Sequence, residues 1–329
     1  MAKRQSALEG VGRMTLGTML QISVCEVCDN SDLEPVVDLG MHPLCDDLIP
    51  LGRQERNEEY PIEILHCAKC GTAHQRFQVR KEKLFPASYH YRARHTLDVL
   101  NGMEELAMSV EKTIGSVEGK LILDIGCNDG SLLACFARRG ATTTGIEPTG
   151  AADDAMAAGH DVLKDFFTPA VAQTFLSAHG QPDVITFTNV FAHIEDLKSV
   201  LEGLRLLMSA ETLLVIENHY LGSIIAHDQF DTFYHEHPRT YSLRSFICIA
   251  DTLGAKLHSV DFPKRYGGNI RVMLSRASNS TETFDAITAR ESGFEKGLVR
   301  LNERVKIWQA RKKALLQFQV ERHGLLLAK

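Results

Sequence analysis

The stretch KLILDIGCNDGSLLACFARRGATTTGIEP, residues 120–148, decides the fold class of this chain of 329 residues. Lys120–Ile125 is a short apolar run bounded by glycines, which is typical of a buried parallel strand. A glycine turn and a helical stretch, Ser131–Arg139, come next, and a second strand is predicted at Thr142–Ile146. This order predicts one unit of a doubly wound α/β fold.

The chain beyond residue 148 continues the alternation. Further strands are predicted at 183–188, 213–217, 256–262 and 269–275, with helices at 151–158 and 197–208. Strands that alternate with helices predict a doubly wound, mostly parallel sheet. Residues 85–115 and about 281–327 have helical patterns.

Composition excludes several classes of protein. With 44% hydrophobic and 24% charged residues the chain is ordinary globular, not disordered or collagenous. A net charge of −6 argues against a nucleic-acid or anionic-membrane binder, so neither partner is expected. No run approaches the roughly 18 apolar residues of a membrane span, and residues 11–22 lack a signal-peptide layout. We expect a cytoplasmic protein.

Four of the eight cysteines form two close pairs, Cys25-x-x-Cys28 and Cys67-x-x-Cys70. Zinc binds four thiolates in a tetrahedron, and each C-x-x-C turn supplies two of them. A secreted disulfide framework would normally occupy a shorter chain with denser cysteines. We therefore predict a structural zinc site; the alternative is four unrelated thiols.

The segment DIGCNDG, residues 124–130, follows the first predicted strand of the α/β region. A dinucleotide site would have G-x-G-x-x-G, whereas this turn has G-x-x-x-G preceded by an acid. That pattern suits a cofactor without phosphate whose cationic amino-acid end needs carboxylates, such as S-adenosylmethionine (SAM). Glu147 ends the next strand, where an acid can accept both ribose hydroxyls. The alternative is a generic strand–turn–helix.

Two polar stretches come later. NVFAH, residues 189–193, follows a predicted strand, and the ligand crevice of a doubly wound sheet lies beyond the carboxyl ends of its strands. His193 is thus placed to reach a substrate near the methyl group, or else it caps the following helix. FDTFYHEHP, residues 230–238, gathers four adjacent proton-transfer side chains, which are costly to bury by accident. Its spacing is not H-E-x-x-H, and the alternative is a solvated polar loop.

The order of these motifs resembles the C-methyltransferases of nucleotide-linked deoxysugars. The motifs are the cysteine pairs, DIGCNDG, GIEP (145–148), NVFAHI (189–194), FDTFYHEH (230–237) and RYGGNIR (265–271). The resemblance runs from about residue 22 to 320, and YHEH is its most specific part. Members of this family have a zinc-binding N-terminal domain and a central SAM domain, and they methylate C-3 of 4-keto deoxysugars in antibiotic pathways.

The resemblance implies a fold, a division of the chain and a set of site residues. It implies a Rossmann-like class I SAM methyltransferase domain with a small zinc-binding domain and a helical tail. We divide the chain into a loose leader (1–20), a zinc-binding domain (21–80), a helical linker (81–118), the SAM domain (119–278) and the tail (279–329). Zinc ligands are Cys25, Cys28, Cys67 and Cys70, and SAM contacts are Asp124, Gly126, Asn128, Asp129, Glu147 and Asn189, with Phe166 or Phe167 near the adenine. His237 is the expected general base, supported by Glu236, Tyr234 and His193, with Tyr89 or Tyr91 of the linker lining the site.

The chain departs from the family in two places. Members usually continue after the tail into a further α/β domain, whereas this sequence stops at Lys329. This difference is compatible with a truncated form, with a partner chain that supplies the lobe, or with a smaller acceptor. The linker run Arg92-Ala-Arg94-His95 is also more basic than expected for the family. The alternatives are that these charges bind an anionic group of the substrate or that they form the solvated start of a helix.

The leading hypothesis is therefore SAM-dependent C-methylation of a nucleotide-activated keto-deoxysugar. A histidine that titrates near neutrality can remove the proton alpha to a ketone, and tyrosine or histidine can hold the enolate oxygen. The alternatives are O- or N-methylation of another small molecule, and a non-catalytic SAM-fold binding module.

Overall fold

The computed structural model describes residues 6–8, 12–50, 52–278, 280 and 283–324, and its centre is a sheet of seven strands. The strand order is β10-β9-β8-β11-β12-β15-β14, with the first five strands parallel and β15 antiparallel to both of its neighbours. The bounds are β8 (Leu121–Ile125), β9 (Thr142–Ile146), β10 (Asp161–Leu163), β11 (Val184–Thr188), β12 (Leu213–His219), β14 (Lys256–Asp261) and β15 (Asn269–Ser275). The predicted doubly wound sheet is confirmed.

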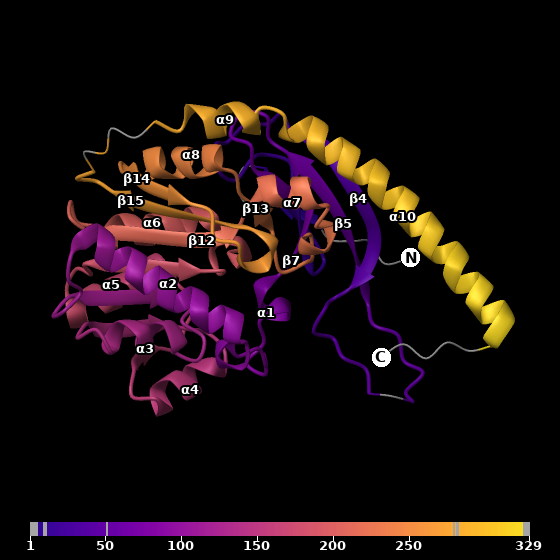
Figure 1. Cartoon of the computed structure of the whole chain (residues 1–329). Helices are drawn as coiled ribbons and strands as arrows, with labels where there is room; N and C mark the ends of the chain where they lie inside the picture. The colour runs from indigo at the N-terminus through magenta and orange to yellow at the C-terminus, as the bar shows by residue number, and fades with distance from the viewer. Residues whose placement is uncertain (1–5, 9–11, 51, 279, 281–282, 325–329) are drawn as a thin grey trace.

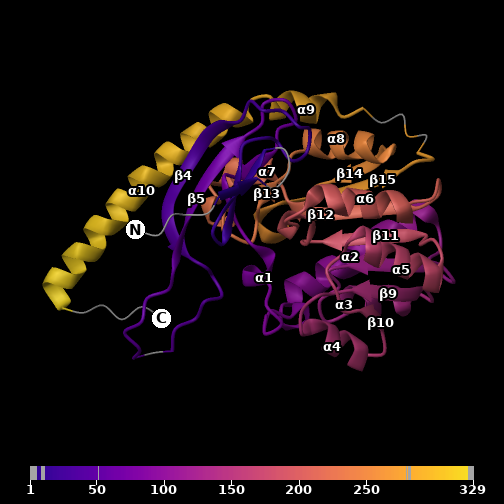
Figure 2. The same cartoon turned by 180° about the vertical axis from the view of Figure 1, so that it is seen from behind.

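Helices cover both faces of this sheet (Figures 1 and 2). Ile122 and Leu123 are consecutive residues of β8 that are both fully buried, because successive side chains of a strand point to opposite faces. Ile122 lies in the cluster formed with α2 (Leu97–Ile114) and α3 (Ser131–Ala137), and Leu123 in the cluster formed with α5, α6 and α8. The other helices of this region are α4 (Ala151–Ala157), α5 (Pro169–His179), α6 (Leu197–Leu207), α7 (Leu221–His227) and α8 (Leu243–Leu253).

The N-terminal part consists of two small antiparallel sheets. One has the order β1-β2-β3-β7 and the other β13-β6-β5-β4. Their strands are β1 (Ser6–Leu8), β2 (Arg13–Leu16), β3 (Met19–Ile22), β4 (Glu34–Pro43), β5 (Glu59–His66), β6 (Ala73–Gln75), β7 (Phe77–Val79) and β13 (Arg239–Thr240). The structure differs here from the loose leader predicted for residues 1–20, because β2 and β3 form a hairpin that pairs with β7. Residues 1–5 and 9–11 of that leader lie outside the described residues.

The strand β13 joins the two halves of the molecule. It comes directly after the FDTFYHEHP segment, yet it pairs with β6 of the N-terminal part at Arg239↔His74 and Thr240↔Ala73. Between the two halves run α1 (Lys81–Leu84) and the short 3-10 helix η1 (Ala93–His95). The linker and the segment before β13 therefore both lie at the junction of the two halves.

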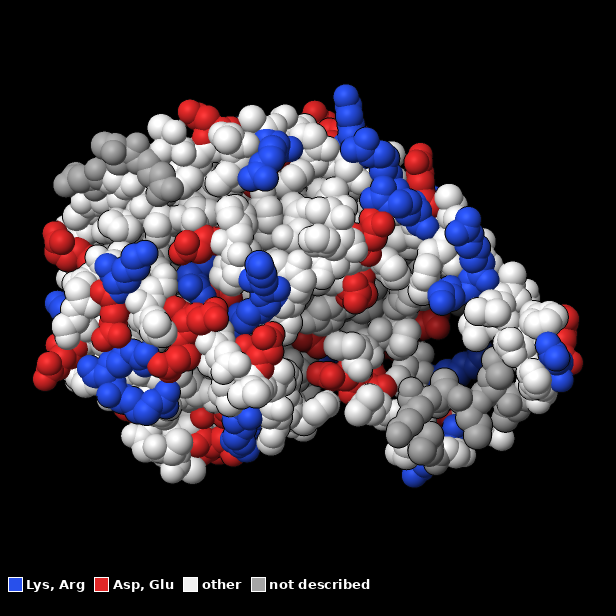
Figure 3. All heavy atoms as spheres, in the orientation of Figure 1, with Lys and Arg blue, Asp and Glu red and all other residues white. Residues whose placement is uncertain are grey.

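The C-terminal part is helical, as predicted, with α9 (Asp285–Glu291) and the long α10 (Phe294–His323). The first half of α10 buries Phe294, Leu298, Leu301 and Val305 and runs along β4, while its second half extends past the body (Figures 1 and 2). Lys and Arg side chains follow α10 along the upper right of Figure 3, whereas both signs of charge mix over the α/β domain. Within the described residues, no helix has the length and apolar character needed to cross a bilayer.

Candidate active site

A cavity of about 530 Å³ lies at the carboxyl ends of β8, β9, β11 and β12, where the linker closes over the sheet. This volume is in the range of sites for drug-sized ligands. Twelve residues named for the site line it, with both members of each alternative pair: Asp124, Gly126, Asn128, Glu147, Phe166, Phe167, Asn189, His193, Tyr89, Tyr91, Tyr234 and His237. Two other predicted residues lie behind its wall: Asp129 accepts a hydrogen bond from the Arg94 N–H of the linker, and Glu236 accepts one from the hydroxyl of Tyr89, which lines the cavity.

The turn after β8 has the backbone conformation that its glycine predicts. Gly126 has φ +74°, and a Cβ atom built there would lie 2.5 Å from a methyl carbon of Val190. Asn128 is also left-handed, with φ +50°. Left-handed backbone is costly for residues with a Cβ atom, so the turn can approach a ligand closely only with glycine at residue 126.

We expect Gly126→Ala to weaken the binding of S-adenosylhomocysteine (SAH) at least tenfold, measured by calorimetric titration. The added methyl group must displace Val190, which lines the same cavity. Gly159→Ala is the matched control, because Gly159 has φ +92° and a Cβ atom added there would meet nothing within 4 Å. That control carries only the backbone strain, roughly 1–2 kcal/mol, and should leave SAH affinity unchanged. Equal losses in both variants would contradict a cofactor role for the turn.

Asp124 is a buried carboxylate at the end of β8. It is 3% exposed and accepts a hydrogen bond of 2.6 Å from the Thr186 hydroxyl. Burial raises its pKa to about 7, and the nearby Glu147 carboxylate adds to the rise. A buried carboxylate of this kind fits the cationic amino-acid end of SAM, because the ligand's charge would offset the cost of ionising it.

We therefore expect SAH to bind more tightly as the pH rises from 6 to 7.5. A carboxyl with a pKa of about 7 is mostly protonated at pH 6 and mostly ionised at pH 7.5, so affinity for an ammonium group should increase roughly eightfold. Calorimetric titration at the two pH values measures the change. The Asp124→Asn variant should bind weakly and show no such dependence, and a wild-type protein with pH-independent affinity would contradict this role of Asp124.

Glu147, at the end of β9, is fixed by three hydrogen bonds. Its Oε1 accepts bonds from the backbone N–H (2.9 Å) and the hydroxyl (2.6 Å) of Thr149, and its Oε2 accepts one from the Asn128 N–H (3.0 Å). A carboxylate offers about four lone-pair sites, so capacity for about one ribose hydroxyl remains. Phe166 lines the same cavity, with the Lys81 ammonium 4.4 Å from its ring centroid, while Phe167 is buried against Phe187.

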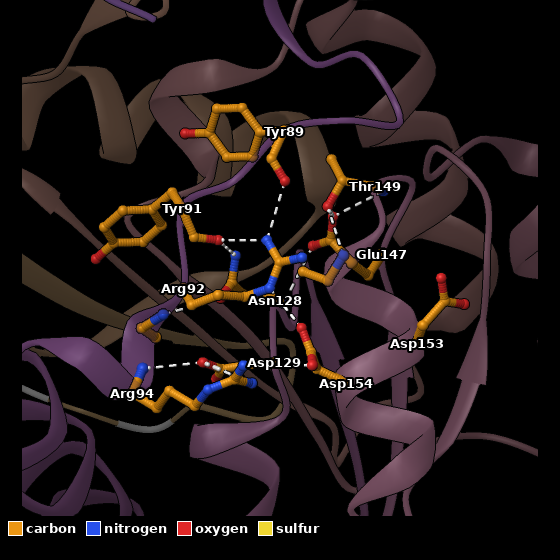
Figure 4. Close-up of polar contacts among 12 residues, drawn as sticks. Tyr89, Tyr91, Arg92, Arg94, Asn128, Asp129, Glu147, Thr149, Asp153 and Asp154 are labelled. Carbon is orange, nitrogen blue, oxygen red and sulfur yellow. Dashed lines mark hydrogen bonds and ion pairs between the residues drawn. The ribbon is translucent and has the colours of Figure 1, made fainter.

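The linker is tied to this cofactor loop by side chains that the sequence pattern assigns to SAM (Figure 4). The Asn128 amide donates to the Tyr91 carbonyl and its oxygen accepts the Ala93 N–H, at 3.2 and 3.0 Å. Asp129 accepts the Arg94 N–H at 2.9 Å, which accounts for its position behind the wall. The side chains of Asn128 and Asp129 thus hold the linker, and the Asn128 backbone N–H holds Glu147.

Arg92 completes this attachment. Its guanidinium donates to the carbonyls of Tyr89 and Tyr91, at 3.0 and 2.9 Å, and pairs with Asp154 of α4 at 2.5 Å (Figure 4). Arg94 reaches the same carboxylate at 3.3 Å. The basic linker residues therefore hold the two tyrosines over the cavity through ion pairs within the chain.

His237 lies at the centre of a group of aromatic rings. The ring centroids of Tyr234, His193 and His219 lie 4.3, 4.7 and 5.2 Å from its own. Its Nδ1 is 2.9 Å from the Thr232 carbonyl oxygen, which can only accept, so Nδ1 carries the proton and Nε2 is the basic atom. Burial, with His193 and His219 nearby, holds the pKa of His237 well below its ordinary value, so the ring is neutral at pH 7.

Glu236 contacts His193 rather than His237. Its Oε2 lies 3.7 Å from the His193 Nδ1 and accepts a hydrogen bond of 3.4 Å from the Tyr89 hydroxyl, and its Oε1 accepts one of 3.1 Å from the Cys45 thiol. Burial raises the pKa of Glu236, and burial together with this carboxylate raises the pKa of Tyr89. Tyr89 and Tyr91 both line the cavity, but only Tyr89 bonds to the YHEH segment.

His219 and Tyr266 also line the cavity, and neither was predicted as a site residue from the sequence. His219 ends β12, two residues beyond the predicted end of that strand, and burial lowers its pKa to about 4. Tyr266 has φ +52° and lies 5.4 Å from His219, ring centroid to centroid. Ligands of a doubly wound sheet lie beyond the carboxyl ends of its strands. Had the strand been predicted to end at residue 219, this rule would have placed His219 at the site. Tyr266 belongs to the RYGGNIR motif, but the order of the motifs along the chain gives no role to this tyrosine.

The four paired cysteines form a cluster that fits zinc. Their Sγ atoms all lie within 4.8 Å of one another, with Cys25–Cys70 at 3.5 Å and Cys28–Cys67 at 3.6 Å. A tetrahedral zinc ion with Zn–S bonds of about 2.3 Å separates its sulfurs by about 3.8 Å, close to these distances. The His74 Nε2 lies 3.3 Å from the Cys25 Sγ and can orient this ligand from outside the shell.

Two family models match the chain. Residues 25–85 match the model for a zinc binding domain, and residues 101–260 match the model for a methyltransferase domain. The predicted organisation is confirmed: a zinc-binding domain with a four-cysteine cluster precedes a domain of the class I SAM methyltransferase fold. The two predicted cofactors, SAM and a structural zinc ion, are the groups that these domains bind.

Curated relatives are methyltransferases. C-methyltransferase NovU from Streptomyces niveus is 28% identical over 271 residues, which are 81% of this chain and 64% of that protein. Ubiquinone biosynthesis O-methyltransferase from Escherichia coli O139:H28 is 33% identical over 99 residues, which are 29% of this chain and 40% of that protein. The chain thus spans less than two thirds of the length of both relatives.

Among solved structures, magnesium protoporphyrin IX methyltransferase from Synechocystis PCC 6803 with bound SAH is similar to this chain. The match covers 55% of this chain and 84% of that protein's chain, with 15% identity and a TM-score of 0.43.

Proposed function

We propose that this protein is a SAM-dependent C-methyltransferase that acts on a nucleotide-activated keto-deoxysugar. One observation carries the proposal: the neutral His237, whose Nε2 is left as its basic atom, lines the same cavity as the buried carboxylates Asp124 and Glu147. A base and a cradle for a cationic methyl donor in one cavity are what methylation of an acidic carbon needs.

The residues divide the chemistry among them. His237 Nε2 removes the proton from the carbon alpha to the ketone, and the electron pair of that C–H bond forms the enolate. Tyr234 and His193, whose rings both lie beside that of His237, face the enolate oxygen as it gains charge. Glu236 holds the hydroxyl of Tyr89 by a hydrogen bond, and its carboxylate lies 3.7 Å from the His193 Nδ1. The enolate carbon is left as the nucleophile for a methyl group, whose bond to the sulfur of a bound donor would break with the electron pair remaining on sulfur.

The cofactor would be held by the residues at the ends of β8 and β9. Asp124 would face its ammonium group, Glu147 its ribose and Phe166 its adenine, with the Gly126 turn against its backbone. When bound, SAM supplies an electrophilic methyl group on a sulfonium. The linker tyrosines and the histidine group line the rest of the cavity, where the acceptor would bind.

O-methylation of a small molecule is the second candidate. The match to an O-methyltransferase over 99 residues supports it, and a neutral histidine can equally remove a hydroxyl proton. The clustering of Tyr234, Glu236 and His237 against one cavity favours catalysis over a silent binding module.

Solvent-deuterium exchange separates these candidates. The protein is incubated in D₂O with SAH and a thymidine-diphosphate-linked 4-keto-6-deoxyhexose, and the sugar is analysed by NMR. We expect deuterium at the carbon alpha to the ketone and, when SAM replaces SAH, a new methyl group on that carbon. Methyl transfer to oxygen without exchange would support the second candidate. Absence of both, in a protein that does not bind SAH, would support the silent module.

The remaining sequence predictions belong to this proposal. These predictions are that the acceptor is a nucleotide sugar and that a partner chain supplies a further lobe. The distal half of α10 supports such a lobe, because Ile307, Trp308, Leu315, Leu316, Phe318 and Val320 are each 46% or more exposed. The cytoplasmic location stays a prediction.

A further inference from the structure

The segment that carries the proposed base, Tyr234–His237, has almost no regular structure of its own. It is a bend and a turn between η3 (Phe230–Thr232) and β13, and one backbone hydrogen bond, from the His237 N–H to the Tyr234 carbonyl at 2.9 Å, closes it. A four-residue turn with one internal bond does not fix the direction of its side chains. The orientation of His237 therefore has to be set by neighbouring elements.

Those neighbours belong largely to the zinc-binding domain. The side-chain amide of Gln75, in β6, donates to the carbonyls of Tyr234 and His237, at 2.5 and 3.2 Å, and so bonds to both ends of the segment. The Gln75 backbone N–H donates to the Pro238 carbonyl at 2.9 Å. Gln75 is 1% exposed, so these bonds are made away from competing water.

Two further contacts anchor the flanks of the segment to the same domain. Directly after it, Arg239 is fully buried and pairs at 2.5 Å with Glu26, which lies inside the first C-x-x-C knuckle. Within it, the His235 Nε2 bonds to the Tyr60 carbonyl of β5 at 3.1 Å. Figure 1 shows β13 beside the strands of this domain. The segment is thus attached to the sheet that the zinc knuckles support.

We propose that Gln75 is a positioning residue, which holds the His237 ring in the cavity by bonding to the carbonyls of Tyr234 and His237. The zinc-binding domain then has a part in the reaction without touching the reacting atoms. Gln75 lies 162 residues before His237 in the chain, and no motif includes it. The expected effect on catalysis rests on the proposed function. The expected effect on the protonation state of His237 rests on geometry alone.

The test uses Gln75→Met, which keeps the volume of the side chain and removes both donors without burying a charge. Gln78→Met is the matched control. Gln78 is also 1% exposed and lies in the same domain, but its amide donates to Glu26 and not to the segment, and Glu26 keeps its ion pairs with Arg239 and Arg13 in this variant. Both variants lose one buried amide, so we expect both to lower the Tm by a similar amount.

The first readout is ¹⁵N NMR of the histidine rings between pH 5 and 8, which needs no acceptor. In the wild-type protein His237 should be neutral and protonated on Nδ1 at pH 7, and its pKa should lie well below that of an exposed histidine, because burial disfavours its charged form. In Gln75→Met the loosened segment should admit water, and the pKa of His237 should rise toward its ordinary value. Gln78→Met should match the wild type.

The second readout is the rate of deuterium exchange into the keto sugar, measured beside SAH affinity. We expect exchange to fall about 100-fold in Gln75→Met, because small displacements of a catalytic group cost about this much, and SAH affinity to stay within about twofold. An unchanged His237 titration in Gln75→Met, or equal changes in Gln78→Met, would overturn the proposal. Absence of exchange in the wild type would overturn the proposed function instead, and the NMR result would still decide the role of Gln75.

Discussion

Replacing His237 with glutamine is expected to lower methyl transfer, and the deuterium exchange that precedes it, by about 10³-fold. Glutamine can still donate a hydrogen bond to the Thr232 carbonyl, but it has no atom that can accept a proton near neutral pH. SAH affinity should stay within about twofold, because Asp124 and Glu147 lie on other strands and keep their contacts. The exchange rate by NMR and the SAH affinity by calorimetry measure the two effects.

His235→Gln is the control for this variant. His235 is the other histidine of the segment, but its Nε2 bonds to the Tyr60 carbonyl and its ring does not line the cavity. Glutamine can still donate to the Tyr60 carbonyl, so this replacement should keep this anchor of the segment, lower the Tm and leave exchange within about threefold of the wild type. If the glutamine variant of His237 kept more than about a tenth of wild-type exchange, another group would have to be the base. His193 would then be the first to test, because it lies in the same cavity with a pKa of about 4.

Removal of zinc is expected to have the largest effect on stability. Cys70→Ala takes one of four thiolates from a cluster that fits a tetrahedral ion, so the bound zinc should fall from one per chain to well below one. Structural zinc supplies folding free energy directly, and we expect the Tm to fall by about 10 °C or more. Elemental analysis and calorimetry on the same preparation measure both quantities. A strong chelator added to the wild-type protein should reproduce the lower Tm.

Cys135→Ala separates loss of zinc from loss of any buried thiol. Cys135 lies in α3 among apolar side chains and donates a hydrogen bond to the Ser131 carbonyl. That variant should keep one zinc ion per chain while losing some stability from the small cavity it leaves. One zinc ion retained by Cys70→Ala, with an unchanged Tm, would contradict a structural four-cysteine site.

Several features were determined by the sequence alone, because they depend on residues close together in the chain. The apolar run before Asp124 and the glycine turn after it predict β8 and its left-handed turn, and both are present. The two C-x-x-C pairs predict a metal cluster because each turn fixes two thiolates locally, and the four sulfurs do meet. The alternation of predicted strands and helices placed β9 and β15 at their observed bounds.

Only the tertiary structure decided which groups meet across the junction of the two halves. Gln75 bonds to a segment 159 to 162 residues away, and Glu26 pairs with Arg239 across 213 residues. The side chains of Asn128 and Asp129 hold the linker, although their positions in the motif suggest contact with the cofactor. Such partners are set by how two sheets pack and by which polar groups burial leaves to be satisfied. These contacts gain their free energy only when the two halves of the molecule are assembled. No periodic pattern within a short stretch of sequence therefore predicts them.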